Sequence, residues 1–263
     1  MGLRQLIKPI VPHAIVVWVQ TWLEHKKRHK RIIASLKPPI KRTCSICSFN
    51  GYFEHWPGPP IIYEMLCPKC QSHTRHRLFW LWFAGKKELL KEPILHFAPE
   101  GLFEKKFRSL YAHYKTADLY ANADLKLNIE SIELDDNSIA TVICNHVLEH
   151  VHNDKKALAE LYRILSPNGC LIISVPIIEG WEKTYENPEI EDLTLRMLHF
   201  GQGDHVRYYG RDFRDRLKQS GFATIKEITA ENPDVLNYGL MAGEKIFFCQ
   251  KNLDITCNEY RKM

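Results

Sequence analysis

Short apolar segments alternate with helical segments between residues 93 and 251, and this pattern most limits the folds open to the chain. Such alternation is typical of a parallel sheet covered by helices on both faces. The expected strands are residues 93–98, 113–118, 125–129, 139–144, 170–175, 222–228 and 244–250, and the expected helices are residues 102–110, 154–165 and 212–220. The sequence therefore predicts an α/β fold with a doubly wound, mostly parallel, seven-stranded sheet.

Polar residues stand where the predicted strands end. The first strand runs into Ala98-Pro-Glu-Gly, the second ends in Asp118, the third ends near Asn128, and the fourth runs into Asn145 and His146. Ligands of open α/β sheets bind beyond the carboxyl ends of the strands, and an acid after the second strand is placed to accept both hydroxyls of a ribose. These strand ends predict a nucleoside-binding edge.

Four of the eight cysteines form two Cys-x2-Cys pairs separated by nineteen residues: Cys44, Cys47, Cys67 and Cys70. Each pair can direct two thiolates at one ion, and two pairs complete the tetrahedral coordination of Zn²⁺. Disulfides, an iron–sulfur cluster or a site that has lost its metal are the alternatives. Four thiolates leave no position for water, so we expect a structural zinc ion in a small N-terminal module. Three other cysteines lie singly in apolar segments, which suits a reducing, cytoplasmic location.

The N-terminal arm carries the chain's basic charge. Residues 1–43 contain ten basic residues and one acid, a net charge of +9, whereas the whole chain has +5. The rest is therefore acidic, and binding of the body to a nucleic-acid backbone is not expected. No apolar run reaches the length of about 18 residues that a membrane-spanning helix needs.

Residues 10–23 of this arm are mostly apolar, and a basic run follows at residues 24–31. An apolar stripe recurs at helical spacing: Ile15, Trp18, Val19, Trp22 and Leu23. One interpretation is a helix lying on an anionic membrane, which would make the protein peripheral to that membrane. The other is a helix that packs its stripe on the rest of the protein.

Two segments around the fourth and fifth predicted strands resemble class I S-adenosylmethionine-dependent methyltransferases: residues 139–151 (IATVICNHVLEHV) and 158–176 (LAELYRILSPNGCLIISVP). Three further segments resemble a subgroup with a four-cysteine zinc knuckle ahead of the methyltransferase domain: residues 67–77, 95–100 and 204–210. The resemblance covers about residues 44–251. It implies a zinc module with a linking helix at 44–90 and a methyltransferase domain at 91–251, and it leaves the basic arm at 1–43 and a tail at 252–263 unmatched.

The resemblance implies that S-adenosyl-L-methionine binds at the strand ends. Ala98, Glu100 and Gly101 would approach its methionine end, Asp118 and Leu119 its ribose, Asn128 and Ile129 its adenine, and Asn145 and His146 its sulfonium. The chain departs from the usual family pattern at several points: the glycine-rich first loop is absent, and His96, Asn128 and Ala140 stand where acids are usual.

Methyl transfer to a hydroxyl requires in-line positioning and a general base, for which histidine is the usual choice. His146 or His205 is the candidate base, with Arg207 orienting a polar or anionic acceptor. We expect structural roles for His96 and His150. Three basic residues after the second cysteine pair could face a ligand or stand on the first turns of a packed helix: Arg75, His76 and Arg77.

The long segment of residues 176–203 is a candidate lid, and its acids would disfavour an acidic acceptor. The leading hypothesis is therefore methylation of a hydroxyl on a small-molecule or saccharide-like acceptor. One alternative is methylation of RNA or protein, with the zinc knuckle and the arm as docking surfaces. Another is a non-catalytic module that binds the cofactor or a partner and uses the zinc knuckle for assembly.

Overall fold

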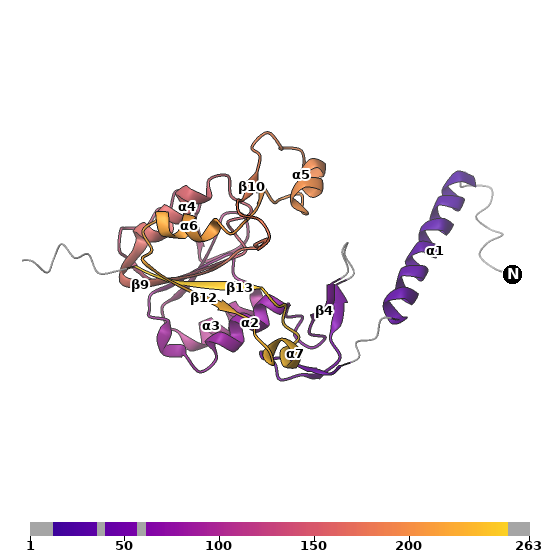
Figure 1. The fold of residues 1–263 in the computed structure, drawn as a ribbon, viewed down its shortest axis with the longest axis horizontal. Helices are drawn as coiled ribbons and strands as arrows, with labels where there is room; N and C mark the ends of the chain where they lie inside the picture. The colour runs from indigo at the N-terminus through magenta and orange to yellow at the C-terminus, as the bar shows by residue number, and fades with distance from the viewer. Residues whose placement is uncertain (1–12, 36–39, 57–61, 252–263) are drawn as a thin grey trace, which may run out of the picture.

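The structure, a computed structural model, describes residues 13–35, 40–56 and 62–251 (Figure 1). The predicted tail at 252–263, and those parts of the arm and zinc module that fall at 1–12, 36–39 and 57–61, lie outside the described residues. A seven-stranded sheet forms the centre, in the order β12-β13-β9-β8-β5-β6-β7. The strands are β5 (Ile94–Phe97), β6 (Tyr114–Asp118), β7 (Leu125–Lys126), β8 (Ile139–Asn145), β9 (Leu165–Ser174), β12 (Thr224–Thr229) and β13 (Lys245–Gln250).

Only β13 runs against the other strands of this sheet, pairing antiparallel with both β9 and β12. The chain moves from β5 through β6 to β7 on one side, and then from β8 to β9 on the other side. The strand order therefore reverses between β5 and β8, and this is the place where doubly wound sheets bind ligands. The predicted fold class is confirmed for the sheet.

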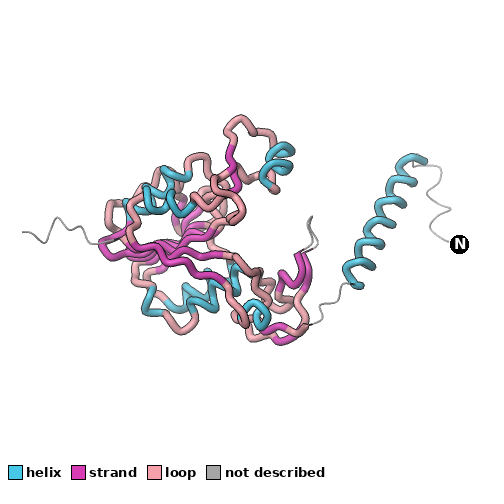
Figure 2. Tube along the Cα trace, viewed as in Figure 1, coloured by secondary structure: helices cyan, strands magenta, loops and turns pink. Residues whose placement is uncertain are grey.

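Helices cover both faces of the sheet (Figures 1 and 2). They are α4 (Asp154–Ile164) and α6 (Phe213–Gln219) on one face, and α2 (Thr74–Phe83) and α3 (Gly101–Leu110) on the other. Successive strand residues serve opposite layers, since Val142 and Leu171 pack with α4 and α6 while Ile143 and Ile172 pack with α2 and α3. Both faces are thus buried, which explains why the central strands read as continuous apolar runs.

The four cysteines lie on two turns of matching geometry, after β1 (Arg42–Thr43) and after β4 (Ile62–Leu66). In the first turn the Ser48 N–H donates to the Cys44 carbonyl, and in the second the Gln71 N–H donates to the Cys67 carbonyl. Ser48 and Gln71 both adopt positive φ angles, 58° and 56°. Two further short strands complete the module: β2 (Asn50–Gly51), which pairs with β1, and β3 (Glu54–Trp56), which pairs with β4.

Arg77 fastens this module to the sheet domain. Its guanidinium is fully buried and donates only to backbone carbonyls, those of Glu64, Met65, Ser72, Tyr238 and Gly239. The first three carbonyls belong to the zinc module, and the last two lie at the end of α7 (Asp234–Tyr238). Burial lowers the pKa of Arg77 to about 10, so it stays charged near pH 7. Arg77 thus has a structural role and does not face a ligand.

Two expected strands need new boundaries. Strand β9 begins at Leu165 instead of residue 170, with an irregularity between the paired positions Leu165 and Cys170, and β7 ends at Lys126 instead of residue 129. Helix α4 begins at Asp154 as expected, where the side chain of Asn153 accepts from the Lys156 N–H. Helix α2 begins at Thr74 with His73 as its N-cap.

The candidate lid is folded against the domain. Its strand β10 (Tyr185–Glu186) pairs with β11 (Arg207–Tyr208), and it carries α5 (Leu193–Phe200), seen at the top of Figure 1. Three apolar side chains of α5 are largely exposed: Leu193, Met197 and Leu198. The remaining short helix, η2 (Lys87–Leu89), links α2 to β5.

The arm forms helix α1 (His13–Ser35), which stands apart from the sheet domain in Figure 1. Its apolar stripe is exposed, with 67% of Trp18 and 45% of Trp22 accessible. The structure therefore does not show this stripe packed on the rest of the protein. None of the helices in the described ranges is long and apolar enough to cross a membrane. Contact of α1 with an anionic membrane stays a prediction.

We expect Arg77→Met to lower the free energy of unfolding by at least about 3 kcal/mol, because it leaves several buried carbonyls without a donor. Urea denaturation followed by circular dichroism would measure this. Arg108→Met is the matched control: Arg108 is 40% exposed in its ion pairs, and its loss should cost about 1 kcal/mol or less. Equal losses for the two variants would contradict the role of Arg77.

Candidate functional site

Adjacent parallel strands bring the predicted residues to one edge of the sheet. Phe97 at the end of β5 pairs with Ala117 of β6 and with Cys144 of β8. The loops that follow these three strands therefore leave the sheet side by side. They carry Glu100, Asp118 and His146, and Asn128 follows the neighbouring β7.

The loop after β5 lacks the usual glycines, and its Ala98 adopts the left-handed backbone conformation that glycine would favour. Ala98 has a φ of 44°, and its N–H donates to the Ala117 carbonyl at 2.8 Å. A positive φ is uncommon for a residue other than glycine, and such strained positions cluster at ligand sites. Gly101 opens α3, and a Cβ built there would meet no atom within 4 Å. The missing glycine-rich pattern therefore does not prevent a tight turn next to open space.

Glu100 is the N-cap of α3 and lies against α2. Its Oε1 is 3.2 Å from Nε2 of His76. Burial alone would raise the pKa of Glu100, but the contact with His76 outweighs it and lowers the pKa to about 2. The carboxylate is thus ionised near pH 7, and its Oε2 is buried with no hydrogen-bond partner among the described residues. His76 therefore contacts the loop that was predicted to approach the cofactor. This position agrees with the interpretation in which His76 faces a ligand.

A small cavity adjoins Glu100, lined by Arg75, His76, Phe79, Glu100, Phe103, Asn145, Ser174 and Ile246. Besides Glu100, it contains the buried Nε of Arg75, which also has no hydrogen-bond partner among the described residues. One unpaired atom on an anion and one on a cation suit the ammonium and carboxylate of an amino acid. The cavity measures about 10 Å³, room for about one water, so side chains must move before the methionine end of a cofactor enters.

Asp118 and Asn128 stabilise their own loops. Oδ1 of Asp118 accepts from the N–H groups of Tyr120 and Ala121, both at 2.7 Å. Since an ionised carboxylate has about four acceptor sites, Asp118 can still accept from ribose hydroxyls. Oδ1 of Asn128 accepts from the Glu130 N–H at 2.9 Å. Of the predicted neighbours, Leu119 is half-buried beside Asp118, and Ile129 is a core residue. The ring of Tyr120 is 92% exposed at this edge.

His146 is held in a strained conformation at the end of β8. Its φ is 53°, and its N–H donates to the Ser174 carbonyl at 2.8 Å. The preceding Asn145 is buried and accepts from the Ser174 hydroxyl through Oδ1 at 2.9 Å. Nδ1 of His146 lies 3.1 Å from Oε1 of Glu149, whose residue is 1% exposed.

Glu149 is the functional residue that sequence reasoning missed. Its signal was the spacing of three residues from His146. Burial alone would raise the pKa of Glu149, but hydrogen bonding to His146 and the neighbouring charge lower it. A carboxylate that accepts from Nδ1–H of a histidine leaves Nε2 with its lone pair, which is the arrangement of an oriented general base.

The structure brings the second candidate base, His205, to the same loop. His205 is buried and packs edge-on against His150, with ring centroids 4.7 Å apart. The N–H of the next residue, Val206, donates to the Glu149 carbonyl at 2.9 Å. His150, for which a structural role was expected, thus contacts a candidate base. By contrast, His96 is fully buried with Nδ1 2.8 Å from the Tyr114 hydroxyl, which confirms its expected structural role.

Arg207 has a different role from the predicted one. It is 3% exposed and donates to the carbonyls of Leu148, Val151 and His152 and to the carboxylate of Glu186. These bonds use four of the five N–H donors that were expected to orient an acceptor. Arg207 therefore positions the loop that carries Glu149 and His150.

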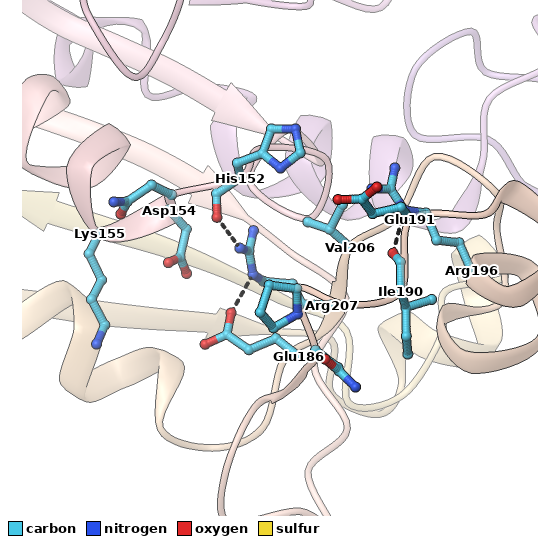
Figure 3. A pocket seen from close by; sticks show the side chains of 12 residues that line it. His152, Asp154, Lys155, Glu186, Ile190, Glu191, Arg196, Val206 and Arg207 are labelled. Carbon is cyan, nitrogen blue, oxygen red and sulfur yellow. Dashed lines mark hydrogen bonds and ion pairs between the residues drawn. The ribbon is translucent and has the colours of Figure 1, made fainter.

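A larger cavity of about 690 Å³ opens beside this loop (Figure 3). It is lined mainly by polar side chains: His152, Asn153, Asp154, Lys155, Glu186, Asn187, Pro188, Ile190, Glu191, Arg196, Val206 and Arg207. The loop after β8 and the candidate lid both contribute to it. Its volume falls in the range of small-molecule sites.

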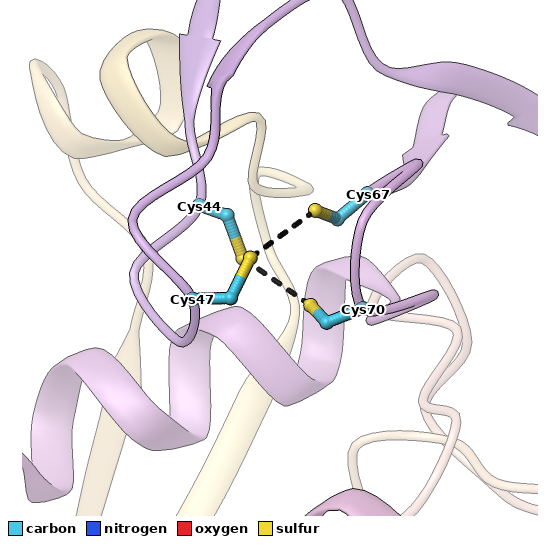
Figure 4. A group of neighbouring side chains, drawn as sticks. All are labelled: Cys44, Cys47, Cys67 and Cys70. Carbon is cyan, nitrogen blue, oxygen red and sulfur yellow. Dashed lines mark hydrogen bonds between the residues drawn. The ribbon is translucent and has the colours of Figure 1, made fainter.

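The four cysteines fit a tetrahedral zinc ion (Figure 4). The sulfurs of Cys44 and Cys70 are 3.6 Å apart, as are those of Cys47 and Cys67, and all four lie within 4.8 Å of one another. Zn–S bonds of about 2.3 Å imply sulfur separations of about 3.8 Å. The set is closed and lies apart from the strand ends, which agrees with a structural role.

Residues 107–173 match the family model described as a methyltransferase domain. Among curated proteins, the ubiquinone/menaquinone biosynthesis C-methyltransferase of Klebsiella pneumoniae subsp. pneumoniae is 29% identical over 129 residues, covering 45% of this chain and 49% of that protein. Its counterpart in Escherichia coli O1:K1 is 29% identical over 123 residues, with the same coverage. The chain thus spans about half the length of these curated relatives.

Solved structures of methyltransferases are also similar to the chain. A methyltransferase from Thermotoga maritima gives a TM-score of 0.44 at 18% identity, covering 63% of this chain and 86% of that one. The 1,6-didemethyltoxoflavin-N1-methyltransferase of Burkholderia thailandensis, with bound S-adenosylhomocysteine, gives 0.40 at 16% identity, covering 60% and 71%.

We expect elemental analysis of freshly reduced protein to find one zinc ion at the four cysteines. Cys67→Ser should lose that ion and lower the thermal stability, since a tetrahedral site does not close with three thiolates. Cys170→Ser, which changes a buried cysteine beside Thr141, is the control and should keep the zinc. A zinc-free wild-type protein, or a Cys67→Ser variant that retains its zinc, would contradict this assignment.

Proposed function

We propose that the chain transfers the methyl group of S-adenosylmethionine to a hydroxyl of a small, saccharide-like acceptor. The match to a methyltransferase domain supports the enzyme class. The placement of Glu100, Asp118 and His146 after neighbouring strands supports a nucleoside-binding edge. When bound there, the cofactor supplies an electrophilic methyl group on a sulfonium.

The observation that carries the hydroxyl assignment is the hydrogen-bonded pair of His146 and Glu149. Nδ1–H of His146 donates to the buried carboxylate, so Nε2 can take the proton of an acceptor hydroxyl. As the new carbon–oxygen bond forms, the carbon–sulfur bond breaks, and its electron pair stays on sulfur. The ionised Glu149 stabilises the imidazolium that results.

The polar cavity of Figure 3 supports the saccharide-like acceptor. Its carboxylates, amides and lysine offer both hydrogen-bond acceptors and donors, as a polyhydroxylated molecule needs. Residues of the loop after β8 line it, so an acceptor bound there lies next to the segment that carries His146. Its wall holds three acids and three bases, and Glu186 is paired with Arg207 and Arg216, so the cavity suits an uncharged polar acceptor.

Helix α5 favours a second candidate, an apolar acceptor. Leu193, Met197 and Leu198 are 66%, 62% and 78% exposed. They belong to the candidate lid, which also lines the polar cavity. The curated relatives are named for ubiquinone and menaquinone biosynthesis, where a carbon atom is methylated. A quinol analogue therefore belongs in the acceptor panel together with free saccharides.

We expect His146→Asn to lower the rate of S-adenosylhomocysteine release by about 10²-fold or more on the best acceptor of that panel. Calorimetry should find the cofactor bound within about threefold of the wild-type affinity, because the variant removes the base and leaves Glu100 and Asp118 unchanged. Lys226→Ala, at an exposed position of β12 on the opposite edge of the sheet, is the control for turnover. Full activity of His146→Asn would exclude His146 as the base, and absence of cofactor binding by the wild type would exclude the function.

A further inference from the structure

A second cluster of potential metal ligands lies beside the candidate base, apart from the four cysteines. One ligand atom each from Glu149, His150 and His205 lies within 4.8 Å of the other two. Two imidazoles with one carboxylate form a ligand set of catalytic zinc and of other divalent transition metals. The three residues come from two segments more than fifty residues apart in the sequence, so the fold assembles the set.

Two buried polar atoms in this cluster lack partners. They are Oε2 of Glu149, in a residue 1% exposed, and Nδ1 of His205, in a residue 6% exposed. Neither has a hydrogen-bond partner among the described residues. Leaving such an atom unpaired costs about 1–3 kcal/mol, so native proteins rarely do so without an ion, a water or a catalytic role. A metal ion between them would satisfy both atoms.

The outer contacts of the cluster suit metal ligands. The other carboxylate oxygen of Glu149 accepts from Nδ1 of His146. Nδ1 of His150 is 3.3 Å from Asp204, both from its backbone carbonyl and from its carboxylate, which leaves Nε2 of His150 for an ion. Metal-bound histidines commonly donate their second ring nitrogen to a carboxylate or carbonyl in this way.

The backbone around the ligands is fixed. The Val206 N–H donates to the Glu149 carbonyl, and Arg207 donates to carbonyls on both sides of Glu149 and His150. The segment of His205 and the loop of Glu149 and His150 are therefore tied together at several points. Such support holds ligand atoms near the geometry that an ion requires.

We propose that Glu149, His150 and His205 bind one divalent transition-metal ion, which coordinates a hydroxyl oxygen of the acceptor. The ion site itself stands on the ligand geometry, whereas the contact with the acceptor rests on the proposed function. Three protein ligands leave at least one coordination position open. An ion there would polarise the acceptor hydroxyl and ease the loss of its proton to His146. The acceptor class is thereby narrowed to molecules that offer a hydroxyl oxygen as a metal ligand.

The test is a titration of the zinc-loaded full chain with Mn²⁺, in which free Mn²⁺ is read by electron paramagnetic resonance. Mn²⁺ is chosen because it prefers oxygen and nitrogen ligands and competes poorly for the four thiolates. Beforehand, the protein is dialysed against EDTA until elemental analysis shows only the zinc of the cysteine site. We expect one bound Mn²⁺ per chain.

Glu149→Gln and His205→Phe should each weaken Mn²⁺ binding at least tenfold. The first keeps the side-chain shape, and the second keeps a ring against His150 while removing both nitrogens. Thermal unfolding verifies that both variants fold. His152→Ala is the control for Mn²⁺ binding, because His152 lies in the same segment but outside the ligand set. No Mn²⁺ binding by the wild type, or equal binding by wild type and both variants, would overturn the site.

Calorimetry with S-adenosylmethionine in EDTA separates this proposal from the proposed function. If Mn²⁺ binds and the cofactor does not, the metal site stands and the proposed function fails. If both bind, Mn²⁺ should raise the rate of S-adenosylhomocysteine release at least tenfold over the rate in EDTA. An unchanged rate would overturn the contact between the ion and the acceptor.

Discussion

The reversal of strand order between β5 and β8 is the constraint on which the site depends. It opens the edge where the loops after β5, β6 and β8 leave the sheet together, and every candidate cofactor residue ends or follows one of these strands or the adjacent β7. Two of these loops begin with a strained residue, Ala98 and His146, each with a positive φ. The surrounding hydrogen bonds maintain that strain, as is common where backbone must approach a ligand.

The four-cysteine module reaches the same edge through α2. The cysteine turns and Arg77 fix the start of this helix, and the helix places His76 against Glu100 in the cofactor loop. On the other side of the edge, Arg207 fixes the loop of Glu149 and His150 by its backbone carbonyls. Buried arginines that donate to carbonyls thus hold both borders of the site.

Local patterns predicted the sheet, its helices and the four-cysteine cluster, because periodicity and ligand spacing are properties of neighbouring residues. The roles of Arg77 and Arg207 were not predictable, since their partners are carbonyls that only the folded chain brings near. Glu149 and His205 are likewise separated by 56 positions, so their shared cluster depends on the tertiary structure.

A crystal structure of the full chain with S-adenosylhomocysteine tests the central claim most directly, namely that this edge holds a nucleoside. The account predicts ribose hydroxyls within hydrogen-bond distance of Asp118, the amino-acid end between Glu100 and α2 after side-chain movement, and the sulfur facing His146. Nucleoside density away from the ends of β5, β6 and β8, or an edge still closed by Arg75 and His76 at saturating ligand, would contradict it.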